Sequence, residues 1–345
     1  AYFKAYERGL LKEKVAKAYS RLKSCTLCLR KCGVDRISGE TGTCKTAKLA
    51  WVSSYNPHFG EEGPLVGTYG SGTIFFTHCN LLCLFCQNFD ISHLGNGQQV
   101  TDDELAGIML DLQNQGCHNI NFVTPSHVVP QILSAVEIAV KRGLSIPLVF
   151  NTGGYDRIST LKLIDGVFDI FMPDFKFWYS EVAETTCQAG DYPEVARRAI
   201  IEMHRQVGDL QVDDAGIARR GLLIRHLVLP NGLAGTREIM RFIAQHVSPD
   251  SYVNLMSQYR PCGRGAEVKG FNRHLRPEER QRRVGQRPAD EAAAAAVEAQ
   301  REMEIAEGAI AVPGDDQPVV VEIELSEDKL FEQIGQDIRS QPVQA

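Results

Sequence analysis

The feature that most constrains the fold of this chain is a repeated alternation of short apolar runs with segments of helical pattern. Six runs with strand character recur between residues 72 and 257. They are 72–77, 119–124, 146–151, 168–173, 222–229 and 251–257. Such alternation favours a parallel sheet in which all strands end at the same edge. The pattern therefore predicts an α/β domain over residues 71–265.

Helix signals accompany this pattern at two places. Thr101 and Glu104 have the spacing of a capping box, which predicts that a helix begins there and continues through Leu112. Residues 1–24 carry apolar residues at helical spacing and predict one amphipathic helix packed on the body of the protein. Its apolar positions are Leu10, Leu11, Val15, Tyr19 and Leu22.

Composition limits the classes of function. A chain of 345 residues can hold one large domain with smaller additions. A net charge of −6 argues against binding that depends on nucleic-acid phosphates, and no apolar run reaches the roughly 18 residues of a membrane span. The first residues lack a secretory signal pattern, so we expect a cytoplasmic protein. We expect four regions: a helix over 1–24, a cysteine-rich metal-binding module over 25–70, the domain over 71–265 and a charged extension over 266–345.

Three cysteines follow directly after the first predicted strand. Cys79, Cys83 and Cys86 have the spacing C-x3-C-x2-C, and thiolates bind iron–sulfur clusters or zinc. A structural zinc ion needs a fourth ligand, for which His78 is the only neighbouring candidate. Three thiols without a clear fourth ligand favour an open coordination position, as in a cluster with one iron free of protein ligands.

Four more cysteines lie within twenty residues near the start of the chain. Cys25, Cys28, Cys32 and Cys44 can close a metal site, either structural zinc or an auxiliary [4Fe–4S] cluster. We favour the cluster slightly, although spacing alone does not decide. Disulfides fit poorly because the chain lacks a secretory signal. The remaining cysteines have no partners in the sequence pattern and are expected to be buried apolar residues: Cys117, Cys187 and Cys262.

Several stretches together resemble an uncharacterised pyruvate formate-lyase activating enzyme-like branch of the radical S-adenosylmethionine (SAM) proteins. They are CTLCLRKCGVDRISGETGTCK, GTIFFTHCNLLCLFCQN, FDIFMPDFKF and LIRHLVLPN, and the resemblance covers about residues 25–265. It implies a partial (β/α)6 barrel and a [4Fe–4S] cluster on Cys79, Cys83 and Cys86. It further implies that this cluster cleaves SAM to a 5′-deoxyadenosyl radical, which takes a hydrogen from a protein or peptide substrate.

The resemblance also assigns further residues to the SAM site. It places Phe85 near the adenine, Asp174 and Lys176 at the SAM site, and Arg225 at the SAM carboxylate. Asn151, with its neighbour Thr152 and with Met172, matches positions that line a monovalent cation. The usual partner is a flavodoxin- or ferredoxin-type electron donor.

The chain departs from true activating enzymes at two strand ends. Where they have Gly-Gly-Glu, this chain has Thr124, Ser126 and His127, which we expect to take over the contact with SAM. Gln258 stands in the segment expected near the SAM ribose, and Asn88 follows the three cysteines. The departures keep two alternatives open: a radical SAM enzyme that acts on a small molecule or cofactor intermediate, and a non-catalytic metal scaffold.

Overall fold

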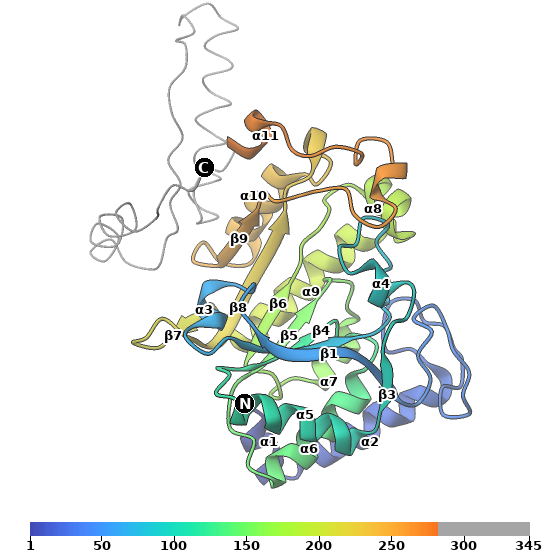
Figure 1. Cartoon of the computed structure of the whole chain (residues 1–345), viewed down its shortest axis with the longest axis vertical. Helices are drawn as coiled ribbons and strands as arrows, with labels where there is room; N and C mark the ends of the chain where they lie inside the picture. Colours follow the sequence, from blue (N-terminus) through green and yellow to red (C-terminus); the bar gives the residue numbers. More distant parts are fainter. Residues whose placement is uncertain (282–345) are drawn as a thin grey trace, which may run out of the picture.

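The computed structural model describes residues 1–281, and its centre is one nine-stranded sheet (Figure 1). The strands are β1 (Ala50–His58), β2 (Ser71–Phe76), β3 (Gln98–Val100), β4 (Ile120–Val123), β5 (Leu148–Thr152), β6 (Ile170–Pro173), β7 (Gln211–Val212), β8 (Ala218–Leu227) and β9 (Tyr252–Met256). The α-helices are α1 (Tyr2–Glu7), α2 (Leu10–Ser20), α3 (Gly63–Val66), α4 (Phe89–Ser92), α5 (Asp102–Asn114), α6 (Val129–Lys141), α7 (Ile158–Leu163), α8 (Ser180–Cys187), α9 (Tyr192–Val207), α10 (Thr236–His246) and α11 (Pro277–Gln281). The 3-10 helices are η1 (Arg21–Ser24), η2 (Pro230–Gly232) and η3 (Gly265–Glu267).

The six predicted strands form the parallel part of this sheet. They are β2, β4, β5, β6, β8 and β9, and neighbours in this order pair in parallel. β4, β5 and β6 are almost wholly buried, as expected for parallel strands covered on both faces. No pairing joins β9 to β2 among the described residues, so the sheet stays open. The expected mixed α/β fold with a partial barrel is confirmed.

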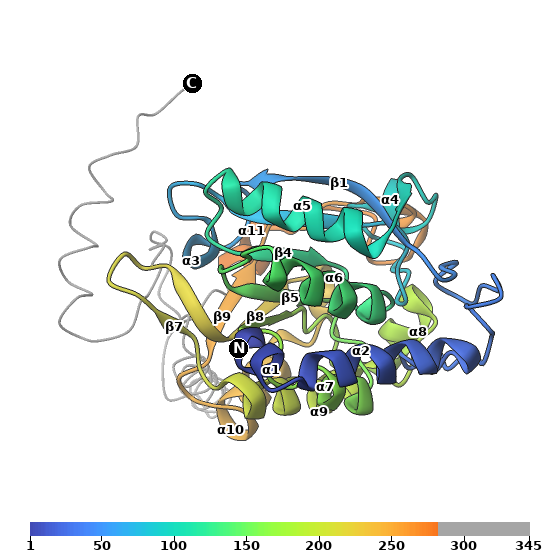
Figure 2. The same ribbon diagram turned by 90° about the horizontal axis from the view of Figure 1, so that it is seen from below.

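Helices cover the outer face of the sheet, and the apolar core lies between the two layers. Figure 2 shows α5, α6, α7 and α9 along this side of the sheet. The core centres on packed rings that come from strands and the loops beside them, namely Phe76, Phe122, Phe150, Phe168 and Phe171. The predicted capping box starts α5: Thr101 accepts from the backbone of Glu104 and Glu104 accepts from that of Thr101. The face of the sheet opposite these helices is available for a functional site.

The single helix expected over residues 1–24 is divided into α1, α2 and η1. Gly9 has a φ of 71°, a left-handed conformation that ends one helix and starts the next. Leu11 and Leu22 are buried as expected, whereas Leu10 is 41% exposed. α2 packs against α6 (Figure 2).

Three strands were not expected from the sequence. β1 pairs antiparallel with both β2 and β3 at one edge of the sheet, and β7 pairs antiparallel with β8. The sheet therefore begins at residue 50, inside the region 25–70 that the sequence assigned to a metal-binding module. The part of that module that remains outside the sheet is the loop of residues 25–49.

The described chain continues past the last strand. Phe271 and Leu275 are buried in the main core, so the first part of the region expected as an extension from residue 266 belongs to the body of the protein. The rest of that region, residues 282–345, lies outside the described residues. None of the helices in residues 1–281 combines the length and apolar character needed to cross a membrane.

Candidate active site

The loop of residues 79–86, which we call the three-cysteine loop, follows β2 and turns sharply. His78 and Leu82 have positive φ angles of 69° and 56°, which non-glycine residues rarely adopt. The loop presents to one pocket the three cysteines Cys79, Cys83 and Cys86. His78, the candidate fourth ligand of a zinc ion, does not line this pocket.

This pocket, which we call the barrel pocket, collects most of the residues that the sequence assigned to a SAM site. Its volume of about 310 Å³ falls within the range of roughly 300–1,000 Å³ typical of small-molecule sites. Besides the three cysteines, the sequence-predicted residues that line it are Phe85, Asn88, Thr124, Asn151, Asp174, Lys176, Arg225 and Gln258. Most of them lie at or beyond the carboxyl ends of parallel strands, where sites of barrel proteins assemble.

Ser126 and His127 do not line the barrel pocket. Ser126 Oγ donates to Asp156 Oδ1 at 2.6 Å inside the protein. The His127 ring lies 3.0 Å from the carbonyl oxygen of Thr77, and burial lowers its pKa to about 3. Of the segment expected to replace Gly-Gly-Glu, only Thr124 reaches the pocket.

An ion network lies at the centre of the barrel pocket. Lys176 Nζ donates to Asp174 Oδ2 at 2.6 Å, and Arg225 Nε donates to Asp174 Oδ1 at 2.8 Å. Arg225 Nη2 also donates to Asn151 Oδ1 at 2.8 Å. Burial by itself raises the pKa of Asp174, but Arg225 and Lys176 outweigh it and hold this pKa below its ordinary value. Asp174 is therefore a carboxylate shared by two cations.

Two glutamates that the sequence did not indicate complete this network. Arg225 Nη1 lies 3.5 Å from Glu61 Oε2 and 3.8 Å from Glu62 Oε1, and both side chains are less than a tenth exposed. They come from residues 59–62 between β1 and α3, which we call the acidic loop. Asn254 in β9 donates to Glu62 Oε1 at 3.0 Å. A Glu pair beside glycines has the pattern of an exposed turn, so only the three-dimensional contact with β8 and β9 reveals its position.

Aromatic rings form another wall of the barrel pocket. Phe85 is 8% exposed, and its ring centroid lies 5.2 Å from that of Phe271 and 5.7 Å from that of Phe177. Tyr259 lines the same pocket at 6.3 Å from Phe85. Cys262, expected to be a buried apolar residue, also lines the pocket. A planar ligand would meet apolar ring surface here.

The cysteines of the barrel pocket are free thiols whose chemistry suits a metal cluster. Burial raises the pKa of Cys79 to about 12 and also raises that of Cys86. An interaction with Cys187, together with burial, raises the pKa of Cys83. Thiols in such a site are neutral on their own, and a bound metal deprotonates them. Three soft donors facing one cavity fit an iron–sulfur cluster.

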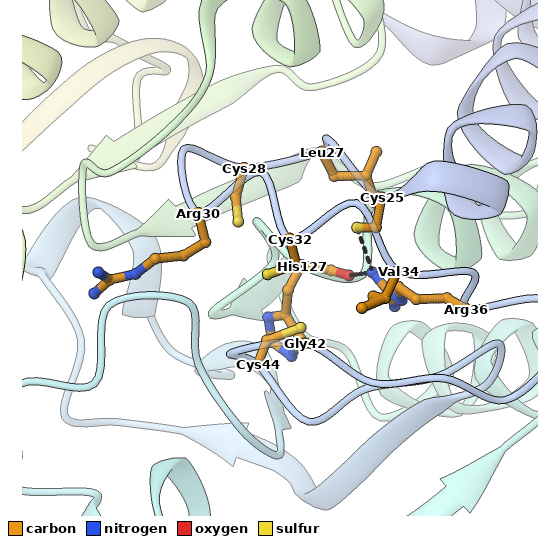
Figure 3. A pocket seen from close by; sticks show the side chains of 10 residues that line it. All are labelled: Cys25, Leu27, Cys28, Arg30, Cys32, Val34, Arg36, Gly42, Cys44 and His127. Atoms are coloured by element: carbon orange, nitrogen blue, oxygen red, sulfur yellow. Dashed lines mark hydrogen bonds between the residues drawn. The ribbon is translucent and has the colours of Figure 1, made fainter.

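The loop of residues 25–44, which we call the four-cysteine loop, encloses a second, smaller pocket. Figure 3 shows the side chains of its four cysteines around a common space: Cys25, Cys28, Cys32 and Cys44. A Cβ at Gly42 would lie 2.5 Å from Cys32 Sγ, so this position needs glycine to leave room for the sulfur. All four are free thiols, and burial raises the pKa of Cys28 to about 12.

A buried arginine faces these thiols. Arg36 is 1% exposed, and its Nη1 lies 3.8 Å from Cys25 Sγ and donates to the His127 carbonyl oxygen at 2.8 Å (Figure 3). In the described chain its Nη2 has no hydrogen-bond partner. A buried guanidinium with an unused donor needs negative charge nearby, and metal-bound thiolates supply it. The donor set and this charge both fit a metal centre.

The two cysteine loops are tied together by Arg30. Its Nε donates to the carbonyl oxygen of Asn80 at 2.9 Å, and its Nη2 donates to those of Leu81 at 3.2 Å and Cys187 at 2.7 Å. Arg30 itself belongs to the four-cysteine loop and lines its pocket. A side chain of one loop therefore holds the backbone of the other in place.

The donor set of the four-cysteine loop fits both candidate metals. A tetrahedral zinc ion binds all four sulfurs at about 2.3 Å from one centre. A [4Fe–4S] cluster binds each thiolate through a different iron.

Fold and site define an α/β protein with an open parallel sheet and a thiol-lined pocket at its strand ends. Over 279 residues the chain is 33% identical to the uncharacterized protein MJ0674 of Methanocaldococcus jannaschii, a match that covers 79% of this chain and 76% of that protein. The chain belongs to the same protein family as MJ0674. No protein-family model matches it.

Among solved structures, the chain is similar to native anSMEcpe with bound AdoMet, with a TM-score of 0.41 and 15% identity over 68% of this chain and 60% of that one. A second structure of that protein, with bound AdoMet and the Cp18Cys peptide, gives a TM-score of 0.40 and 14% identity over 68% and 59%. The chain thus spans about 60% of the length of these structures.

Proposed function

We propose that this protein is a radical SAM enzyme whose Cys79, Cys83 and Cys86 hold a [4Fe–4S] cluster. The observation that carries the proposal is the meeting of three free thiols with a buried ion network and an aromatic wall in one pocket. Three thiolates leave one iron without a protein ligand, and the resemblance to radical SAM proteins implies that SAM binds there. The cluster, once bound, supplies the electron that cleaves SAM to the radical that takes hydrogen from the substrate.

The residues of the barrel pocket then have distinct tasks. Phe85 offers its ring to the adenine of SAM. Arg225 already donates to Asp174 and Asn151, so we assign it to holding this network in position. Within the described residues, the Lys176 ammonium donates one hydrogen bond, to Asp174. Two of its three N–H donors therefore remain for the SAM carboxylate. Thr124 takes the place of the missing Gly-Gly-Glu segment.

The proposed reaction is hydrogen abstraction from a protein or peptide, as in glycyl-radical activating enzymes. A small molecule is the second candidate substrate, and one observation favours it. Glu61 and Glu62 put buried charges into the barrel pocket, where a compact polar group can reach them but a flat protein surface cannot. The two candidates share the same SAM chemistry and differ only in the substrate.

We further propose that Cys25, Cys28, Cys32 and Cys44 bind a second [4Fe–4S] cluster. Four thiols around one space and the unused donor of Arg36 support a metal centre here, and an auxiliary cluster would suit the radical chemistry proposed for the barrel pocket. A flavodoxin- or ferredoxin-type protein is the proposed source of electrons. The proposed compartment is the cytoplasm, where thiols stay reduced and free to bind metal.

Electron paramagnetic resonance of the reconstituted, dithionite-reduced protein tests the SAM site. If SAM binds the open iron, its addition changes the spectrum of the reduced cluster in the wild type. Cys83→Ala loses that SAM-sensitive signal, whereas Cys117→Ala keeps it, because Cys117 is buried away from both pockets. A spectrum that SAM leaves unchanged in a fully loaded wild-type protein contradicts the proposal.

A further inference from the structure

The acidic loop closes the open side of the partial barrel. Leu65, just after this loop in α3, is fully buried in a small core with Val149, Met172 and Leu223. Figure 1 shows α3 beside β8. The strands before and after α3 in the chain, β1 and β2, lie in another part of the sheet. The chain before α3 therefore lies against β8 and β9, and its carboxylates enter the barrel pocket from that side.

Carboxyl groups outnumber cationic groups in this part of the pocket. The carboxyl groups of Asp174, Glu61 and Glu62 face the two cations Arg225 and Lys176. The side chains of Glu61 and Glu62 are 7% and 4% exposed, so water screens them poorly. A buried carboxylate without a full complement of partners is costly, which makes one more cation favourable here.

One oxygen in this cluster is left without a partner. Glu62 Oε1 accepts from Asn254, but Glu62 Oε2 has no hydrogen-bond partner in the described residues. Asn121 lies beside Glu61, where it lowers the pKa of that carboxyl group. Glu62 lines the barrel pocket directly, so its free oxygen can receive a donor from a bound molecule.

We propose that Glu62, supported by Glu61, binds a primary ammonium group of the substrate inside the barrel pocket. This inference rests on the proposed radical SAM function and names the chemistry of its substrate. A primary ammonium supplies the missing positive charge together with N–H donors for Glu62 Oε2. Asn254 and Arg225 are positioning residues, because they hold the two carboxylates that face the ammonium.

Ligand-observed NMR on the reconstituted full chain tests the ammonium site. The probes are n-butylammonium and, as a neutral analogue of the same shape, n-butanol, both in potassium chloride buffer. With the wild-type protein, we expect saturation transfer to n-butylammonium but not to n-butanol. Glu62→Gln keeps the shape of the side chain and should weaken butylammonium binding by about tenfold or more, as expected for a lost charged hydrogen bond.

Two further variants keep this test falsifiable. Glu13→Gln, at an exposed position on α2, removes one negative charge elsewhere and should bind the probe like the wild type. Glu61→Gln should weaken butylammonium binding less than Glu62→Gln does. If circular dichroism shows that Glu62→Gln is unfolded, Glu61→Gln replaces it in the test. Equal binding of butanol and butylammonium, or unchanged binding in both glutamate variants, overturns the proposal.

Competition and a second probe separate the sources of the ammonium. If SAM and butylammonium bind together, the site belongs to the substrate, whereas displacement of butylammonium by SAM assigns Glu62 to SAM and overturns the inference. If a capped Gly-Lys-Gly peptide binds as well as butylammonium, a peptide lysine is the source of the ammonium group. If butylammonium binds and this peptide does not, the source is a free amine. Formation of 5′-deoxyadenosine is measured separately, so failure of the SAM chemistry remains distinguishable.

Discussion

At the residue scale, the barrel pocket is organised by partly buried charges. Asp174 stays ionised because Arg225 and Lys176 outweigh the cost of its burial. Glu61 lacks such full compensation: burial raises its pKa to about 7, Glu62 and Asp174 add to the rise, and Arg225 opposes it. The two carboxylates therefore differ in protonation near neutral pH although they share one arginine.

This difference predicts how stability depends on pH. The pKa of Glu61 is raised from 4.5 to about 7, so its contribution to the free energy of unfolding is fully present below about pH 4.5 and is lost as the pH rises through about 7. The loss amounts to roughly 3 kcal/mol. Glu61→Gln stays neutral and should gain stability relative to the wild type between about pH 5 and about pH 8, as measured by urea unfolding.

The matched control for this prediction is Glu13→Gln. Glu13 is 64% exposed, so its replacement should change the free energy of unfolding by less than about 0.5 kcal/mol at either pH. Parallel stability curves for the wild type and Glu61→Gln would show that Glu61 does not titrate as its burial requires.

Individual site residues differed in how far the sequence could predict them. Asp174 and Lys176 stand two apart at a strand end, and side chains at this spacing share one face, so the pattern could place both at one site. The structure adds that they form an ion pair. Ser126 and His127 follow a strand end equally closely, yet neither lines the barrel pocket, and Ser126 Oγ and the Nε2 atom of His127 meet buried partners instead. A pattern places a residue near a site but does not tell which way its side chain points.

At the element scale, α5 begins at a capping box that the sequence predicted. Thr101 Oγ1 accepts from the backbone N–H of Glu104 at 3.2 Å, and Glu104 Oε2 accepts from that of Thr101 at 2.7 Å. Thr101→Ala should lower the free energy of unfolding by about 1 kcal/mol. Thr185→Ala, at an exposed position of α8, removes a similar hydroxyl that caps no helix and should cost less. Equal losses of stability in thermal denaturation would contradict the role of the cap.

The four-cysteine loop should depend on its metal for its structure. Its local apolar cluster contains only Leu22, Cys25 and Leu27 as buried members, too few to fix the loop by packing. Cys44→Ala, or removal of the metal with a chelator, should therefore expose residues 25–49 to protease while the sheet stays protected. Proteolysis followed by mass spectrometry locates the cuts.

The control for this prediction is Cys117→Ala, which removes a buried thiol outside both pockets. It should keep the metal content and the protease resistance of the loop. A Cys44→Ala protein whose loop is as resistant as that of the wild type would show that packing, not metal, holds this segment.

The parallel strands were predictable and the antiparallel ones were not, for a physical reason. Strands β4, β5 and β6 are covered on both faces and so read as continuous apolar runs. β1 lies near the edge of the sheet, and its middle residues 54–56 are exposed. Its mixed composition, with Ser, Asn and Pro, therefore gave no clear strand signal.

At the scale of the whole molecule, segments far apart in the sequence meet around the barrel pocket. Arg30 joins the four-cysteine loop to the three-cysteine loop, and the acidic loop joins the β1–β2 edge to β8 and β9. These long-range contacts close the open barrel and explain why the sequence predicted the thiols but not Glu61 and Glu62. The fold thus puts both proposed clusters and the charged pocket into one connected unit.

Cleavage of SAM is the direct test of radical SAM activity in this protein. The protein is purified and reconstituted without oxygen, its iron and sulfide are counted, and SAM and dithionite are added with Cys83→Ala as control. We expect about eight irons per chain for two [4Fe–4S] clusters and 5′-deoxyadenosine from the wild type only. About four irons with zinc would contradict only the second cluster. No 5′-deoxyadenosine from a fully loaded protein, even with cell extract as a source of substrate, would contradict radical SAM activity and favour a non-catalytic metal scaffold.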